Sequence, residues 1–186
     1  MDDTWKWFHI TVHTYAAWLY GDARGFRTRH HREHVEGDYK NPPPAGKYAK
    51  ELDASKKLMT QEAVSLDPEW RKIVGAALRD KLMALGAQVL CVSMGSTHAH
   101  ILAKMPPGPT PRLWVGRAKA KASLVAKDHG WSGKLWGVRS KITPIRNRQH
   151  QLNTFGYILA HVDEGAWVWD FRDASDPGRP WAFGTG

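Results

Sequence analysis

The chain has 186 residues, enough for one domain with a buried core, and 42% of them are hydrophobic, an ordinary share for a globular protein. No run approaches about 18 uninterrupted apolar residues and the N-terminus lacks a signal-peptide pattern, so we expect residues 1–186 to form one cytoplasmic domain without a membrane span. Lysine and arginine number 27 against 18 aspartate and glutamate, and this net charge of +9 favours a polyanionic partner over a membrane surface.

Hydrophobic periodicity and turn residues predict the elements in chain order. Alternation predicts a strand over 7–15, and a long irregular segment at about 20–65 follows, with room for a short helix at 55–64. Asp67 as N-cap and Pro68 in the first turn predict a helix that runs to Leu85. The remaining elements are strands at 88–94 and 97–105, a basic helix at 110–129, a strand at 134–145, a helix at 148–160 and an irregular tail at about 170–186.

This order predicts an α+β fold. The first six elements form a ferredoxin-like βαββαβ unit, an antiparallel sheet with two helices on one face. Right-handed crossovers place the first and third strands in the middle of the sheet. The final helix is additional to this unit.

Two histidines on the third strand are the most informative residues. Because strand side chains alternate between faces, His98 and His100 point the same way, about 7 Å apart, as in a metal chelate. Tyr157 and His161 lie one turn apart on the last predicted helix and therefore share a helix face. These four side chains converge if that helix crosses the open face of the sheet.

Ten tryptophans are present, several of them beside a cation, as in Trp5-Lys6-Trp7 and Lys134-Leu135-Trp136. Aromatic rings interleaved with cations suit single-stranded nucleic acid, because bases stack on the rings and phosphates are neutralised. The alternative is that most of these tryptophans anchor the core. The one cysteine, Cys91, sits in an apolar strand and is expected to be a small buried hydrophobe.

Four segments together resemble a known family, the HUH (His-hydrophobic-His) single-tyrosine transposases. The chain is most similar to the REP-associated tyrosine transposases of bacteria, over roughly residues 5–170. The matching segments are Phe8–His13 for the first strand, Thr97–Leu102 for the metal-binding strand, Gly133–Trp136 before the last core strand, and Phe155–Ile158 for the catalytic helix.

The resemblance implies an activity. Family members nick and rejoin single-stranded DNA at hairpin-flanked sites through a 5′-phosphotyrosine intermediate. It implies Tyr157 as the nucleophile, and His98, His100 and His161 as ligands of a divalent metal, Mg or Mn. It also implies single-stranded or hairpin DNA as the partner, a monomer or homodimer, and a bacterial, nucleoid-associated location.

The chain departs from the family pattern in two places. Position 161 usually holds an amide residue, whereas here it is His161, which favours softer metals such as manganese, cobalt or zinc. His161 could instead act as a base near Tyr157 or face solvent. The basic segment at 20–65 is longer than the family's first loop, and is either a DNA-gripping loop or a solvated one.

Basic residues in three segments are expected to contact DNA phosphates. They are Arg27, Arg29 and Arg32 in the long segment, Arg112, Arg117, Lys119 and Lys121 in the basic helix, and Arg139, Lys141 and Arg146 in or after the following strand. Two other functions stay open: a domesticated protein that binds hairpin DNA without cutting it, and an unrelated metal hydrolase with the three histidines as zinc ligands.

Overall fold

The computed structural model describes residues 5–23, 44–108 and 110–173. Within these residues the chain has an α+β fold, with four α-helices and a five-stranded antiparallel sheet. In chain order the elements are β1 (Lys6–Thr14), α1 (Ala49–Lys57), α2 (Pro68–Ala84), β2 (Gln88–Met94), β3 (His98–Met105), α3 (Pro111–Asp128), β4 (Trp136–Pro144), α4 (Arg148–Ala160), the 3-10 turn η1 (His161–Glu164) and β5 (Trp167–Asp170).

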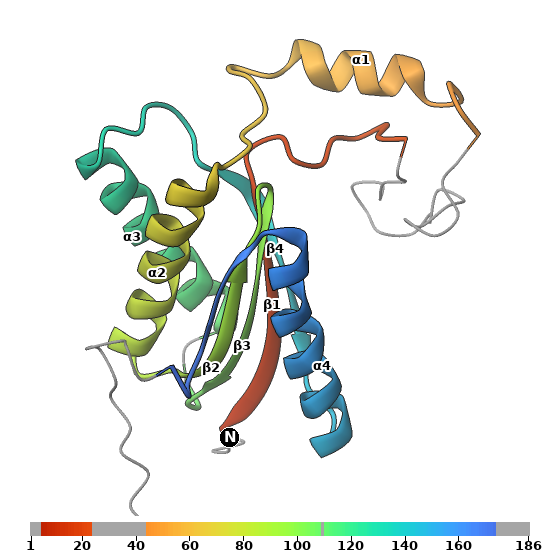
Figure 1. The fold of residues 1–186 in the computed structure, drawn as a ribbon. Helices are drawn as coiled ribbons and strands as arrows, with labels where there is room; N and C mark the ends of the chain where they lie inside the picture. The colour runs from red at the N-terminus through yellow and green to blue at the C-terminus, as the bar shows by residue number, and fades with distance from the viewer. Residues whose placement is uncertain (1–4, 24–43, 109, 174–186) are drawn as a thin grey trace, which may run out of the picture.

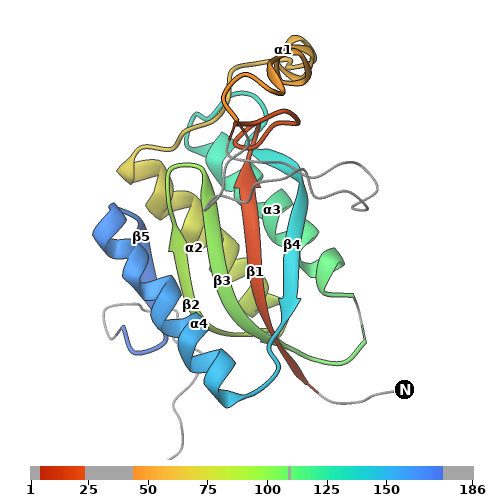
Figure 2. The same ribbon diagram turned by 90° about the vertical axis from the view of Figure 1, so that its right-hand side faces the viewer.

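The strand order is β4-β1-β3-β2-β5, so β1 and β3 occupy the middle of the sheet as the sequence predicted. Figure 2 shows the sheet face-on with the strands in this order. The register of β1 on β3 pairs Thr11 with His100 and His13 with His98. This pairing decides which residues of β1 stand beside the two histidines.

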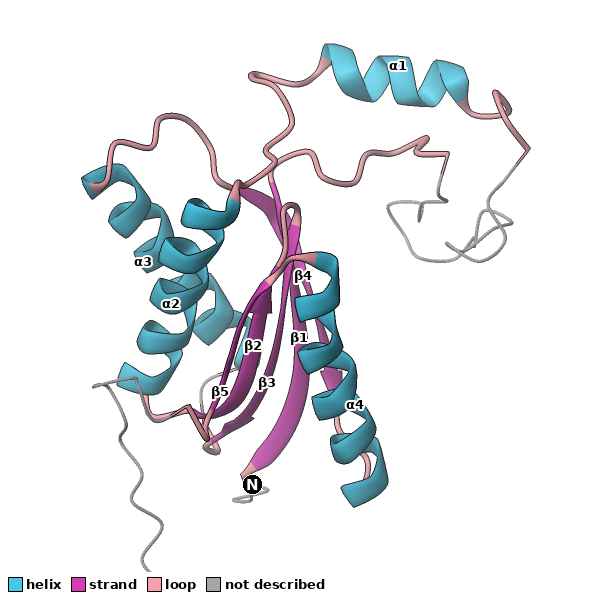
Figure 3. Ribbon diagram, in the orientation of Figure 1, coloured by secondary structure: helices cyan, strands magenta, loops and turns pink. Residues whose placement is uncertain are grey.

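The two faces of the sheet are covered differently. Helices α2 and α3 pack on one face and α4 on the other, with the sheet between them (Figure 1 and Figure 3). The large core lies under α2 and α3 and takes Ala99 and Ile101 from β3. A smaller cluster under α4 takes the next alternating residue, Leu102, with Cys91 of β2 and Ile158 of α4. The side chains of His98, His100 and Leu102 on β3 therefore face α4.

Capping residues explain where the helices begin. The Asp67 side chain accepts a hydrogen bond from the Trp70 amide, as expected for the predicted N-cap of α2. The Asn147 side chain does the same for the His150 amide and begins α4. Asn147 thereby fixes the start of the helix that carries Tyr157.

Two elements differ from the expectation. The short helix of the long segment spans Ala49–Lys57 instead of 55–64, and none of its residues is buried, so no core-facing pattern marked its position. The sequence did not predict β5, which pairs antiparallel with β2 and extends the sheet to Asp170. Residues 174–186 of the predicted tail and 24–43 of the long segment lie outside the described residues. Over the described part of the chain, no helix is long and apolar enough to cross a membrane.

Candidate active site

The site is built on the face of the sheet that α4 covers. His98 and His100 alternate with Ala99 and Ile101, which enter the opposite core, so both histidines project toward α4. His161 follows directly after the last residue of α4 and begins η1. The strand and the helix end thus bring His161 to a histidine pair that lies about 60 residues earlier in the sequence.

The three histidines offer nitrogens that all lie within 4.8 Å of one another. His100 and His161 stack almost parallel, with ring centroids 4.9 Å apart, and the His98 ring stands edge-on to both. Two nitrogens bonded to one tetrahedral ion at about 2.1 Å lie about 3.4 Å apart, so the most widely spaced pair needs to close by up to roughly 1.4 Å to share an ion.

Each of the three rings uses Nδ1 for a protein contact. His98 Nδ1 lies 3.3 Å from Thr97 Oγ1, and His161 Nδ1 lies 3.0 Å from a Glu164 carboxylate oxygen. His161 Nε2 is buried and has no hydrogen-bond partner among the described residues. A metal-binding histidine commonly donates its other ring N–H to a carboxylate or carbonyl, which fixes the ring and its tautomer. The donor set, the Nδ1 contacts and the orphaned nitrogen all fit a divalent metal.

His100 is the most constrained member of the trio. Its Nδ1 lies 3.0 Å from His9 Nε2 and 3.2 Å from Thr11 Oγ1, both on the neighbouring strand β1. Burial, followed by the nearby histidines, lowers the pKa of His100 to about 2. Burial and the charge of Lys141 lower the pKa of His9 to about 4. Both rings are therefore neutral at pH 7, the state in which an imidazole binds a metal.

Tyr157 stands at the rim of this cluster and is 50% exposed. Its hydroxyl lies 3.3 Å from His100 Nε2, and its ring packs edge-on against His100 and His161, with centroids 5.2 and 4.8 Å apart. A half-exposed tyrosine beside the histidines is accessible to a substrate. His100 is a poor base for it, because an imidazole with so low a pKa holds a proton weakly.

His161 does not face solvent. Only 9% of its surface is exposed, and it contacts His98, His100 and Tyr157. With Nδ1 engaged by Glu164, the buried Nε2 is the nitrogen left for a ligand.

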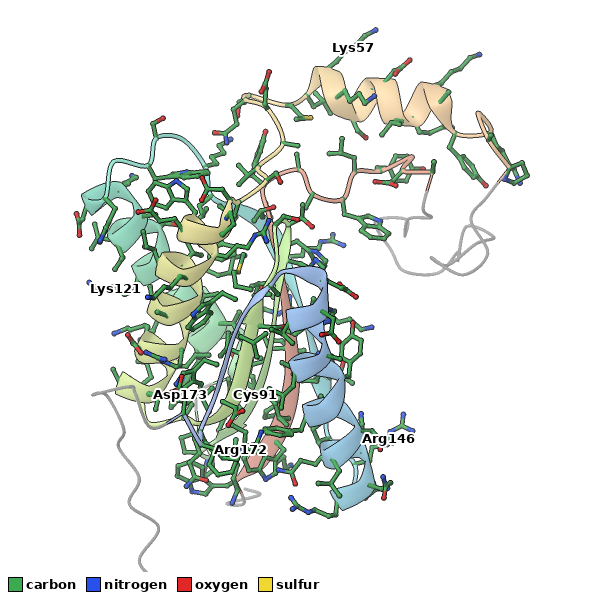
Figure 4. The ribbon with its side chains drawn as sticks, in the orientation of Figure 1. Lys57, Cys91, Lys121, Arg146, Arg172 and Asp173 are labelled. Atoms are coloured by element: carbon green, nitrogen blue, oxygen red, sulfur yellow. The ribbon has the colours of Figure 1, made fainter. Side chains whose placement is uncertain are left out.

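The predicted DNA-contacting residues are divided between the two sides of the sheet. Lys141 pairs in register with Thr11, so it lies on the face of the histidine cluster, and its charge reaches His9. Arg139 and Arg146 are exposed on β4 and just before α4. Figure 4 shows Arg146 beside α4 and Lys121 beside α3, across the sheet. Lys121 is therefore remote from Tyr157.

The other basic residues of α3 share that remote side. Arg112 and Arg117 are partly or fully exposed on a helix that packs against α2 and β4, away from the histidines. Lys119 is engaged within the fold, since its Nζ donates to the Gly137 carbonyl oxygen at 2.6 Å. Arg27, Arg29 and Arg32 lie outside the described residues.

The sequence reasoning did not single out His9, Thr11 and His13 as site residues. They occupy alternate positions of β1 and therefore line the face that carries His98 and His100. The expected pairing of the first and third strands, combined with this alternation, was the available signal.

The chain was compared with known proteins. No known family matches it, and no curated protein matches its sequence. Among solved structures it is similar to a REP-associated tyrosine transposase bound to a REP hairpin, with 15% identity and a TM-score of 0.43, over 86% of this chain and 68% of that one. A likeness this distant assigns no function.

Proposed function

We propose that the protein cuts and rejoins single-stranded DNA, with Tyr157 as the nucleophile and His98, His100 and His161 as the ligands of a divalent metal. One observation carries the proposal: the hydroxyl of a half-exposed tyrosine lies 3.3 Å from a histidine that belongs to a trio suited to a metal. A nucleophile beside a trio that could hold a metal is an arrangement that supports phosphoryl transfer.

The chemistry is a transesterification that conserves the phosphodiester energy. The Tyr157 hydroxyl loses its proton to water as its oxygen forms a bond to the scissile phosphorus, while the bond from phosphorus to the 3′ oxygen breaks. This leaves the 5′ end attached to Tyr157 and a 3′-hydroxyl that takes a proton from water. A divalent metal, when bound, polarises the phosphate and stabilises the charge that develops there. Rejoining reverses the same steps, so no nucleotide hydrolysis is needed.

The donor set argues for particular metals. Three neutral imidazoles are borderline ligands, whereas Mg²⁺ prefers oxygen ligands and retains several waters. Manganese, cobalt or zinc therefore suits this trio better than magnesium. Of the two metals that the resemblance implies, we propose Mn on the ground of this ligand chemistry.

The surface around Tyr157 suits a nucleic acid strand. Helix α4 contacts β2, β3 and β5, and in Figure 2 no helix of the described residues lies in front of β1 and β4. Lys141 and Arg139 are exposed on β4, where they can contact backbone phosphates. The net charge of +9 adds long-range attraction.

The test is capture of the covalent intermediate. The protein is incubated with Mn²⁺ and a pool of labelled single-stranded oligonucleotides, each with a hairpin and randomised flanks, and the products are resolved on a denaturing gel. We expect a labelled protein band that is lost in Tyr157→Phe, because that variant lacks only the attacking oxygen. Tyr48→Phe, at the start of α1 and far from the histidines, is the matched control and should retain the band.

Three outcomes separate the alternatives. An adduct that persists in Tyr157→Phe excludes Tyr157 as the nucleophile. Hairpin binding without any adduct indicates the non-cleaving DNA-binding protein. The trio of imidazoles also matches the ligand set of some zinc hydrolases, and phosphoester cleavage that needs zinc but survives Tyr157→Phe would identify the chain as one of these.

A further inference from the structure

Aromatic rings continue from the histidine trio to an exposed tryptophan. His13, opposite His98 in the sheet, has its ring centroid 5.9 Å from that of His98. The Trp18 ring follows at 6.3 Å from His13. Trp18 is 43% exposed, although a tryptophan usually hides most of its surface. The row leads from the predicted metal ligands to open solvent.

The turn after β1 sets the position of Trp18. The Ala17 amide donates to the Thr14 carbonyl oxygen and closes the turn, and Ala16 within it has a φ of 55°. Among the described residues, Ala16 is the one non-glycine with a positive φ. An alanine is held in this region only by surrounding structure, and such strain clusters at functional sites. Figure 1 shows that this loop leaves β1 at the end of the sheet where α4 ends.

We propose that the Trp18 indole stacks a nucleobase of the bound single strand, and that the His13 ring extends this stacking surface toward His98. The stacked base belongs to one of the first few nucleotides beside the phosphate that Tyr157 attacks. This inference rests on the proposed function and adds a base-binding subsite to it. An exposed indole suits any base, because every base has a π-face.

Charge on the same face favours an anionic partner over an apolar or basic peptide, and the exposed indole adds a surface for bases. Lys141 is exposed on the face of Thr11, on the strand beside β1, and can hold a backbone phosphate while the base lies on Trp18. Phosphates beside a cation and bases on a ring are the two features of single-strand binding sites.

Binding to two probes tests the subsite. The full-length protein in EDTA is titrated by fluorescence anisotropy into labelled oligothymidylate of about 12 nucleotides and into an abasic deoxyribose-phosphate oligomer of equal length. Trp18→Ala should weaken oligothymidylate binding by roughly 5- to 150-fold. Binding of the abasic oligomer should be unchanged, because that oligomer has no base for Trp18 to stack. Trp18→Phe, which keeps an aromatic face, should restore most of the affinity.

Trp5→Ala is the matched control. Trp5 is 39% exposed but lies before β1, at the opposite end of the strand from His13, so its loss should not change the preference for oligothymidylate over the abasic oligomer. Thermal unfolding of each variant shows whether the fold is retained.

The results distinguish this inference from the proposed function. Unchanged oligothymidylate binding in Trp18→Ala, an equal loss for both probes, or a wild-type protein that does not prefer oligothymidylate overturns the subsite, whether or not the Tyr157 adduct forms. A selective loss in Trp18→Ala supports the subsite even if no adduct is found, in which case only the cutting activity fails.

Discussion

The contacts of His100 Nδ1 predict how firmly the trio binds a metal. When Nε2 of His100 is the ligand, Nδ1 carries the proton and donates it to His9 Nε2 at 3.0 Å or Thr11 Oγ1 at 3.2 Å. Loss of such a supporting partner typically weakens metal binding by 10- to 100-fold, about 1.4 to 2.8 kcal/mol. Because two acceptors serve one N–H, either can replace the other.

The two residues are therefore expected to be partly redundant. His9→Ala and Thr11→Val should each weaken Mn²⁺ or Co²⁺ binding by less than about tenfold, whereas the double variant should reach the full 10- to 100-fold loss. The losses should then be non-additive, as for residues that share a partner. Isothermal titration calorimetry on the metal-free chain measures the affinities.

His129→Ala is the control, because His129 is an exposed histidine at the end of α3, away from the site. It should bind metal like the wild type. A double variant that also keeps wild-type affinity would refute the role of His9 and Thr11, and an equal loss in His129→Ala would show that the ions bind elsewhere.

Two further predictions concern stability. Ile158→Ala empties a fully buried position between α4 and the sheet and should lower the free energy of unfolding by about 2 to 5 kcal/mol in urea denaturation. Leu152→Ala, on the exposed side of α4, should lower it little. Equal losses in the two variants would contradict this packing. The pKa values of His9 and His100 are lowered, so both bind protons more readily in the unfolded chain, and the metal-free protein should lose stability as the pH falls from about 6.5 toward 4. Denaturation at a series of pH values measures this loss. His9→Gln should reduce the slope of the free energy of unfolding against pH. Greater stability at acid pH would contradict the prediction.

Local signals predicted most of the fold. Asp67 and Pro68 marked the start of α2, and the alternation around His98 placed β3 and its two faces. β5 was missed because Trp167–Asp170 is a four-residue edge strand, too short for alternation to show. Its position depends on pairing with β2, a long-range contact.

Local signals also predicted part of the candidate site, and a long-range contact decided the rest. The facing of His98 and His100 follows from local periodicity, and the neighbours of Tyr157 follow from helical spacing. The position of His9 beside His100 depends on the register between β1 and β3, which cannot be read from the sequence alone.

The tryptophans show where composition misleads. Trp114, beside Arg112 in sequence, is buried in the main core, and the Trp136 indole donates to the Lys119 carbonyl oxygen. Neighbours in sequence thus point to different sides of an element. Trp18, which has no adjacent cation in sequence, lies against His13 beside the candidate site.

The small cluster beneath α4 has a consequence for the cooperativity of the molecule. Cys91, Leu102 and Ile158 are its fully buried residues, whereas the opposite face rests on a far larger core. Elements held by few buried contacts open without global unfolding. Detachment of α4 would carry away Tyr157 and displace His161, while His98 and His100 stay on an intact sheet. The proposed active site can therefore come apart in a protein that spectroscopy still reports as folded.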